Sequence, residues 1–137
     1  MQTLRTLLGW LMGLLYIAAG INHFWHPGFY VKIMPPYLPW HETLVYLSGV
    51  IEIFLGLLIF IPRYRALAAW AIIAMLIAFM PVHIHMVMSP QLYPDVPEYV
   101  LWLRLPLQAV LIAWAYWYTR PSSSLQKTYT ETASSLT

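Results

Sequence analysis

The stretch ALAAWAIIAMLIAFMPVHIHMVM, residues 66–88, decides the fold class. It contains no Asp, Glu, Lys or Arg, and it exceeds the roughly 20 residues that a helix needs to cross a bilayer. The whole chain has a similar character, since 61% of its 137 residues are hydrophobic, 16% are aromatic and only 9% are charged. An average soluble domain carries about a quarter charged residues. This composition cannot cover a water-facing surface, so we predict that lipid surrounds the protein.

Four apolar stretches are long enough to span a bilayer, namely Leu4–Asn22, Thr43–Ile61, Ala66–Met88 and Tyr99–Tyr118. The first could be mistaken for a cleaved signal peptide, but three more spans follow it, so we expect it to remain in the protein. We therefore predict an all-α, integral membrane four-helix bundle over residues 1–120. Residues 121–137 are rich in Ser and Thr and lack apolar periodicity. They are predicted to form a disordered polar tail.

A segment rich in Pro and aromatic residues, residues 24–40, joins the first two spans. Pro35, Pro36 and Pro39 lie within five residues and exclude a continuous helix there. Aromatic rings favour the headgroup layer of a membrane. We predict an outer loop that lies along the membrane surface.

Basic residues are distributed unevenly about the spans. One side collects Arg5, Arg63, Arg65, Arg120 and Lys127. The other side has only Lys32 in its loops, because Arg104 lies inside the fourth span. The positive-inside rule then predicts that both termini are cytoplasmic.

Several function classes are disfavoured by composition. The net charge is +2 and no basic run is interleaved with aromatics, so there is no electrostatic case for nucleic-acid binding. The absence of Cys excludes disulfides, thiolate metal sites and thiol redox chemistry by the chain itself. Signature motifs of nucleotide-binding proteins and of zinc and serine hydrolases are also missing.

Polar residues within the spans are the candidate functional residues. Glu52 lies nine residues from either end of its span, at a depth where an ionisable side chain costs about 2.5 kcal/mol or more. Stripes of small and polar residues predict the inward face of each helix. These stripes are Gly9, Gly13, Tyr16, Gly20 and His23; Ser48, Glu52 and Gly56, with Gly49 alongside; Ala71, Ala74, Ala78, Pro81 and His85; and Arg104, Gln108, Leu111 and Ala115.

Helix rise places Arg104 roughly 7 Å and Glu52 roughly 14 Å below the outer boundary. We therefore predict an ion pair between them, which could serve binding or could only fix the register of the helices. The proposed catalytic residues are Glu52 and His23. The proposed ligand-binding residues around them are Tyr16, Asn22, His83, His85, Arg104 and Gln108.

Metal binding is an alternative reading of His83 and His85. Residues two apart on a helix point about 200° away from each other, so they could share an ion only if the helix unwinds near Pro81. His23, Glu52 and one of these histidines have ligand types suited to zinc, copper or iron. No tight ligand spacing supports such a site, and we assign no metal.

A family resemblance rests on four motifs. They are Ala19-Gly20-Ile21-Asn22-His23-Phe24 followed by Pro27, Ser48-Gly49-Val50-Ile51-Glu52 with Gly56, Arg65 with Ala68-Ala69, and Leu103-Arg104-Leu105-Pro106-Leu107-Gln108. Together they resemble the DoxX family of small bacterial membrane proteins, over about residues 4–120. The resemblance implies a four-helix bundle in a bacterial inner membrane, often redox-associated, with one relative a subunit of a thiosulfate:quinone oxidoreductase. His23, Glu52 and Arg104 are the polar residues that match this pattern.

Two hypotheses follow for the function. In the first, a polar cavity in the outer half of the bundle binds a quinone-like or other amphipathic small molecule, as in a subunit of a quinone-linked oxidoreductase. In the second, the chain is a non-catalytic subunit or assembly factor that contacts a membrane protein partner or another copy of itself. A quinone is the cofactor that the first hypothesis allows.

Overall fold

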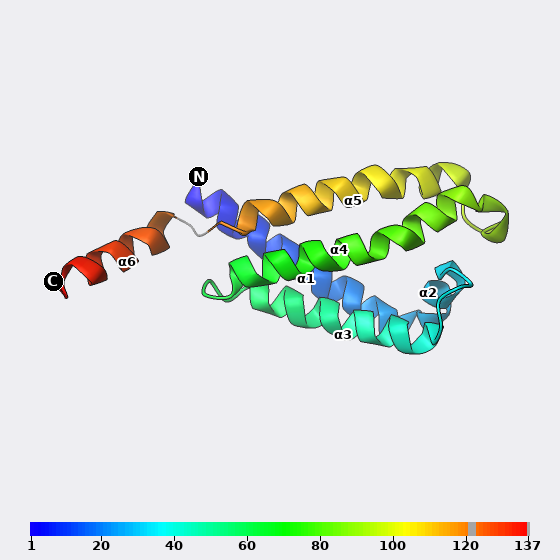
Figure 1. Ribbon diagram of the computed structural model, residues 1–137, viewed down its shortest axis with the longest axis horizontal. Coiled ribbons are helices and arrows are strands. Elements are labelled where there is room, and N and C mark those ends of the chain that lie inside the picture. Colours follow the sequence, from blue (N-terminus) through cyan, green and yellow to red (C-terminus); the bar gives the residue numbers. More distant parts are fainter. Residues whose placement is uncertain (121–122, 137) are drawn as a thin grey trace.

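The computed structural model describes residues 1–120 and 123–136, and its ribbon is helical nearly throughout (Figure 1). The elements in chain order are α1 (Gln2–Trp25), α2 (Pro27–Ile33), α3 (His41–Ile59), α4 (Arg65–Met88), the 3-10 helix η1 (Pro90–Leu92), α5 (Glu98–Tyr118) and α6 (Ser123–Ser134). In this described part, α1, α3, α4 and α5 are the helices long and apolar enough to cross a membrane. The prediction of an all-α protein with four spans is confirmed.

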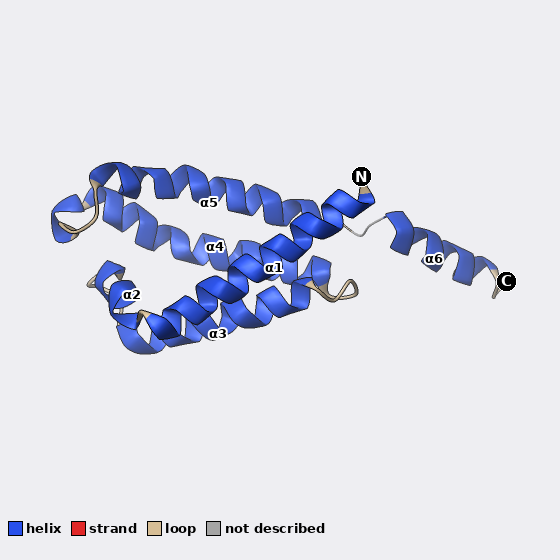
Figure 2. Cartoon of the chain, turned by 180° about the vertical axis from the view of Figure 1, so that it is seen from behind, coloured by secondary structure: helices blue, strands red, loops and turns tan. Residues whose placement is uncertain are grey.

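The four long helices form two antiparallel pairs. α1 packs along α3, α4 packs along α5, and the contact of α3 with α4 joins the pairs. Figures 1 and 2 show the start of α1, the α3–α4 link and the end of α5 at one end of the bundle, which we call the terminal end. We call the other end, which carries α2 and the α4–α5 link, the α2 end.

Two glycine contacts hold α1 against α3. A Cβ added to Gly13 would lie 2.8 Å from the carbonyl oxygen of Gly56, and one added to Gly20 would lie 2.5 Å from that of Gly49. The reciprocal distances, from Gly56 to Gly13 and from Gly49 to Gly20, are 2.7 and 2.9 Å. The contacts lie two helical turns apart on both helices. The two backbones therefore touch, as small residues allow in membrane bundles.

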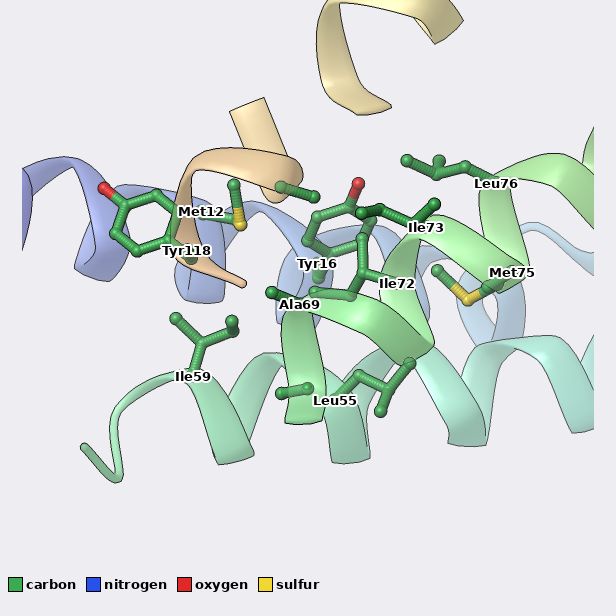
Figure 3. Close-up of a cluster of buried hydrophobic side chains, with 12 residues drawn as sticks. Met12, Tyr16, Leu55, Ile59, Ala69, Ile72, Ile73, Met75, Leu76 and Tyr118 are labelled. Carbon is green, nitrogen blue, oxygen red and sulfur yellow. The ribbon is translucent and has the colours of Figure 1, made fainter. Parts of the chain in front are cut away.

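The core lies where α4 packs between α3 and α5. Its residues include Met12, Tyr16, Leu55, Ile59, Ala69, Ile72, Ile73, Met75, Leu76 and Tyr118 (Figure 3). The predicted inward stripe of α4 is wrong, because Ala74, Ala78 and Pro81 are exposed. Ala68 and Ala69 and several larger side chains fill the interface of α4, so Ala74 and Ala78 can face lipid without loss of packing.

The segment between α1 and α3 contains a helix that the sequence did not predict. α2 has Pro27 at its first position, where a proline is tolerated, and it ends at Ile33 before the prolines that follow. Ile33 is buried in a second small core with Met86, Tyr93 and Leu101, at the α2 end of the bundle. α2 is thereby anchored to α4 and to the α4–α5 link.

Helix α6 occupies part of the segment that we predicted to be disordered. Thr130 and Thr132 donate hydrogen bonds of 2.8 Å to carbonyl oxygens four residues back. Such bonds satisfy the Thr hydroxyls within the helix but do not themselves favour helix formation. The prediction also covered residues 121, 122 and 137, which lie outside the described residues. Helix α6 extends away from the bundle (Figure 1).

Candidate functional site

The centre of the site is a buried contact between α1 and α3. Nδ1 of His23 lies 3.2 Å from Oε2 of Glu52, and each residue is only 6% exposed. Helical side chains lean toward the N-terminus of their helix. Because α1 and α3 are antiparallel, the side chains of His23 and Glu52 lean toward each other. The glycine contact beside them, where His23 Cβ would meet a Cβ on Gly49 at 2.8 Å, sets their separation.

The surroundings of His23 define its tautomer. Nδ1 also lies 2.8 Å from the carbonyl oxygen of Ala19. A carbonyl oxygen can only accept, so Nδ1 carries a hydrogen and donates it to Ala19. Oε2 of Glu52 lies near this N–H, but the N–H points to Ala19. Oε2 therefore has no hydrogen-bond partner among the described residues. The contact between His23 and Glu52 is therefore electrostatic.

Tyr16 lies two helical turns before His23 on α1. Its ring belongs to the core beside Ile72 and Ile73 of α4 (Figure 3). Its hydroxyl is buried and has no hydrogen-bond partner within the described part of the chain. The hydroxyl is close enough to the carboxylate of Glu52 for the two groups to interact electrostatically. Two buried oxygens without a hydrogen bond in the described residues, one from Tyr16 and one from Glu52, thus occur in the same region of the bundle.

Tyr30 of α2 covers His23 from the α2 end. The two rings are stacked, with centroids 3.8 Å apart and an interplanar angle of 18°. Asn22 donates a hydrogen bond of 2.8 Å to the Tyr30 hydroxyl, and its own amide oxygen lies 2.9 Å from Nδ1 of His26. Asn22 was predicted as a ligand-binding residue, and the structure places it where it positions Tyr30. Sequence reasoning missed Tyr30 because α2 was not predicted.

Arg104 does not pair with Glu52. The only ion pair among the described residues is the one between His23 and Glu52. The predicted pair of Glu52 with Arg104 is therefore wrong. Depth alone suggested that pair, but α5 packs along α4 and not along α3. Nη1 of Arg104 instead contacts Sδ of Met86 at 3.8 Å. The guanidinium of Arg104 is also close enough to Tyr30 and His83 to interact with them electrostatically.

His83 and His85 lie in different surroundings. Nδ1 of His83 is buried and has no hydrogen-bond partner in the described residues. Nδ1 of His85 lies 2.9 Å from the hydroxyl of Tyr93, which donates at 3.4 Å to the carbonyl oxygen of Ile33. Burial raises the pKa of Tyr93 above its ordinary value. No group of three metal-ligating side chains occurs in the residues that the structure describes.

Gln108 joins α5 to α4. Its side chain is 4% exposed, and Nε2 donates a hydrogen bond of 2.8 Å to the carbonyl oxygen of Leu76. The structure thus places this predicted ligand-binding residue in a contact between helices. The side chains closest to the centre of the site are therefore Tyr16, His23, Tyr30 and Glu52, with Arg104 and His83 on its α4–α5 side.

Comparison with known proteins gives a family but no activity. Residues 12–119 match the family model described as "Domain of unknown function (DUF8561)". Comparison with curated proteins and with solved structures found no match. The matching family is not DoxX, so the comparisons give the resemblance to DoxX no support.

Proposed function

The chain belongs to the DUF8561 family and is a multi-pass membrane protein, and we propose that its buried site binds an amphipathic small molecule and exchanges a proton with it through Glu52. The proposed ligand has an apolar body and a headgroup that carries oxygen. A quinone-like molecule has both, and its reduction takes up protons. In this proposal the chain provides the binding site and the proton path, and the electrons come from a redox partner.

The observation that carries this proposal is that Oε2 of Glu52 and the hydroxyl of Tyr16 are both buried without a hydrogen bond in the described residues. A buried polar atom without a partner costs about 1–3 kcal/mol. The cost is largest where no water can compensate, as in the interior of a membrane bundle. A headgroup that accepts from the Tyr16 hydroxyl and bonds to the Glu52 carboxyl would satisfy both atoms.

The arrangement around Glu52 suits proton exchange. The Nδ1–H of His23 faces the carboxylate and stabilises its negative charge, while the Ala19 carbonyl holds the ring in that orientation. Glu52 in its protonated form can donate the proton to a ligand oxygen, and its carboxylate can take one back. His23 supports the carboxylate in this scheme and stays bound to Ala19.

Residues at the α2 end complete the proposed site. Tyr30 covers His23, and its hydroxyl lies in electrostatic range of Arg104. Arg104 and the unpaired Nδ1 of His83 are available to a second oxygen of the ligand. Movement of α2, which is seven residues long and ends at Ile33, would open this side of the site.

A binding experiment with matched variants tests the proposal. The probe is decylubiquinone added to purified protein in mild detergent, with quenching of Trp fluorescence as the readout. We expect Glu52→Gln and His23→Ala to weaken binding by about tenfold or more, since the first removes the carboxyl group that meets the headgroup and the second removes the N–H that supports it. Glu42→Gln is the control, because Glu42 is an exposed residue on the same helix.

Binding of decylubiquinone to the Glu52→Gln variant with wild-type affinity would contradict the proposal. The alternative, a non-catalytic subunit or assembly factor, makes a different prediction. Native mass spectrometry of protein extracted in mild detergent would then show a stable protein partner, and the variants at Glu52 and His23 would leave that complex intact.

A further inference from the structure

A groove at the terminal end of the bundle is unrelated to the site around Glu52. It has a volume of about 1020 Å³ and lies between the start of α1, the α3–α4 link and the end of α5. Four arginines line it, Arg5, Arg63, Arg65 and Arg120, and its described lining contains no Asp or Glu. The groove is therefore strongly cationic.

Two of the arginines build the walls of the groove. Arg5 of α1 donates to the carbonyl oxygens of Trp117 at 3.0 Å and Arg120 at 2.6 Å, which ties the start of α1 to the end of α5. Nε of Arg65 donates at 2.8 Å to the carbonyl oxygen of Ile59, the last residue of α3. These contacts use uncharged acceptors, so the positive charges of Arg5 and Arg65 remain uncompensated.

The other two arginines present their charge at the surface. Arg63 and Arg120 are exposed, and their guanidinium carbons lie 5.6 and 5.7 Å from the ring centroids of Tyr64 and Tyr116. In the described part of the chain neither has a carboxylate within ion-pair distance. Stacking on a tyrosine orients a guanidinium and leaves its N–H groups available to an anion.

The N-terminus of α4 adds to the positive potential. This 24-residue helix begins at Arg65, and its N-cap residue, Tyr64, makes no side-chain capping bond. The first N–H groups of a helix have no partner within the helix and favour phosphate. The helix dipole and the arginines therefore attract an anion to the same place.

Apolar side chains complete the groove on the side of the spans. Leu4 and Trp10 line the groove and are 58% and 47% exposed. Both belong to α1, which is a candidate membrane span. Where a span ends, basic groups meet lipid phosphates and the adjoining apolar side chains meet acyl chains. We propose that this groove binds an anionic phospholipid, whose phosphodiester lies among the arginines and whose acyl chains lie along Leu4 and Trp10.

Native mass spectrometry with defined lipids tests this inference. Purified protein is titrated with phosphatidylglycerol or phosphatidylcholine in mild detergent, and the lipid-bound fraction is measured. We expect wild-type protein to prefer phosphatidylglycerol and the double variant Arg63→Gln/Arg120→Gln to bind it about thirtyfold more weakly. Lys32→Gln is the control, because Lys32 is an exposed cation at the α2 end.

Further measurements separate the possible outcomes. The variant Arg63→Lys/Arg120→Lys keeps both charges and should retain most of the affinity for phosphatidylglycerol, which distinguishes lost binding from lost folding. Equal binding of the two lipids by wild-type protein would overturn the inference. So would thermal stabilisation by inorganic phosphate equal to that by phosphatidylglycerol, since the groove would then be a site for free phosphate.

Discussion

Gly20 of α1 and Gly49 of α3 approach so closely that a Cβ on Gly20 would lie 2.5 Å from the carbonyl oxygen of Gly49. This contact determines the distance between the two helices at the level of the candidate site. It leaves room for Cβ of His23 against Gly49 and for the carboxylate of Glu52 beside Nδ1 of the same histidine. A larger residue at either glycine would separate the side chains of His23 and Glu52 as well as the two backbones.

Substitution of Gly20 by Ala should therefore destabilise the protein. Overpacking of this kind costs about 1–3 kcal/mol, because the close neighbours of Gly20 include backbone atoms that cannot rotate away. Thermal unfolding in detergent measures the effect. Gly28→Ala is the matched control, since a Cβ on Gly28 would meet nothing within 4 Å. An unchanged midpoint for Gly20→Ala would show that α1 and α3 do not pack through these glycines.

Substitution of Tyr16 by Phe should separate stability from binding. Loss of a buried hydroxyl without a partner leaves the free energy of unfolding unchanged or raises it by about 1 kcal/mol. The same change should weaken binding of decylubiquinone, because the proposed ligand loses a hydrogen-bond donor. Denaturation and fluorescence quenching measure the two effects. A clear loss of stability would mean that the hydroxyl has a partner within the protein.

Substitution of Tyr30 should loosen α2. Tyr30→Ala removes both the stacked ring over His23 and the hydrogen bond from Asn22. Tyr30→Phe removes only the hydrogen bond, so it serves as the graded control. Hydrogen–deuterium exchange of residues 28–34 should increase strongly in Tyr30→Ala and weakly in Tyr30→Phe. Equal exchange in both variants would show that the stacking does not hold α2 in place.

Tyr93 should make stability depend on alkaline pH. Its folded-state pKa is raised by burial above the ordinary value of 10.0, so the folded state holds the phenolic proton more tightly than the unfolded state does. The stabilisation is complete below pH 10.0 and is lost as pH rises through the folded-state pKa. The thermal midpoint should therefore fall further between pH 8 and about pH 11 in the wild-type protein than in Tyr93→Phe. Equal changes in both proteins would contradict this assignment.

Hydropathy and helical periodicity predicted the long elements and much of the interior. Four candidate spans follow from the length of the apolar stretches, and the stripes that contain His23 and Glu52 do face the interior. The stripe of Ala74 and Ala78 was wrong, because a small residue on a membrane helix fits a close contact and a lipid-facing surface equally well.

The partner of Glu52 could not be predicted from depth. Arg104 and His23 are both compatible with its level in the bundle, and the choice depends on which helices are neighbours. Glycines on both α1 and α3 favour their close contact, and this contact gives Glu52 a histidine partner. Tyr30 was also missed, since a seven-residue helix between proline-rich segments leaves little periodic signal.

Infrared difference spectroscopy of the Glu52 carboxyl group tests the central claim most directly. Spectra are recorded for purified protein with and without decylubiquinone, in wild type, Glu52→Gln and Glu42→Gln. The proposal predicts a change in a carboxyl band on binding that is present in wild type and Glu42→Gln and absent in Glu52→Gln. A difference spectrum of Glu52→Gln identical to that of wild type would show that Glu52 neither meets the ligand nor exchanges a proton with it.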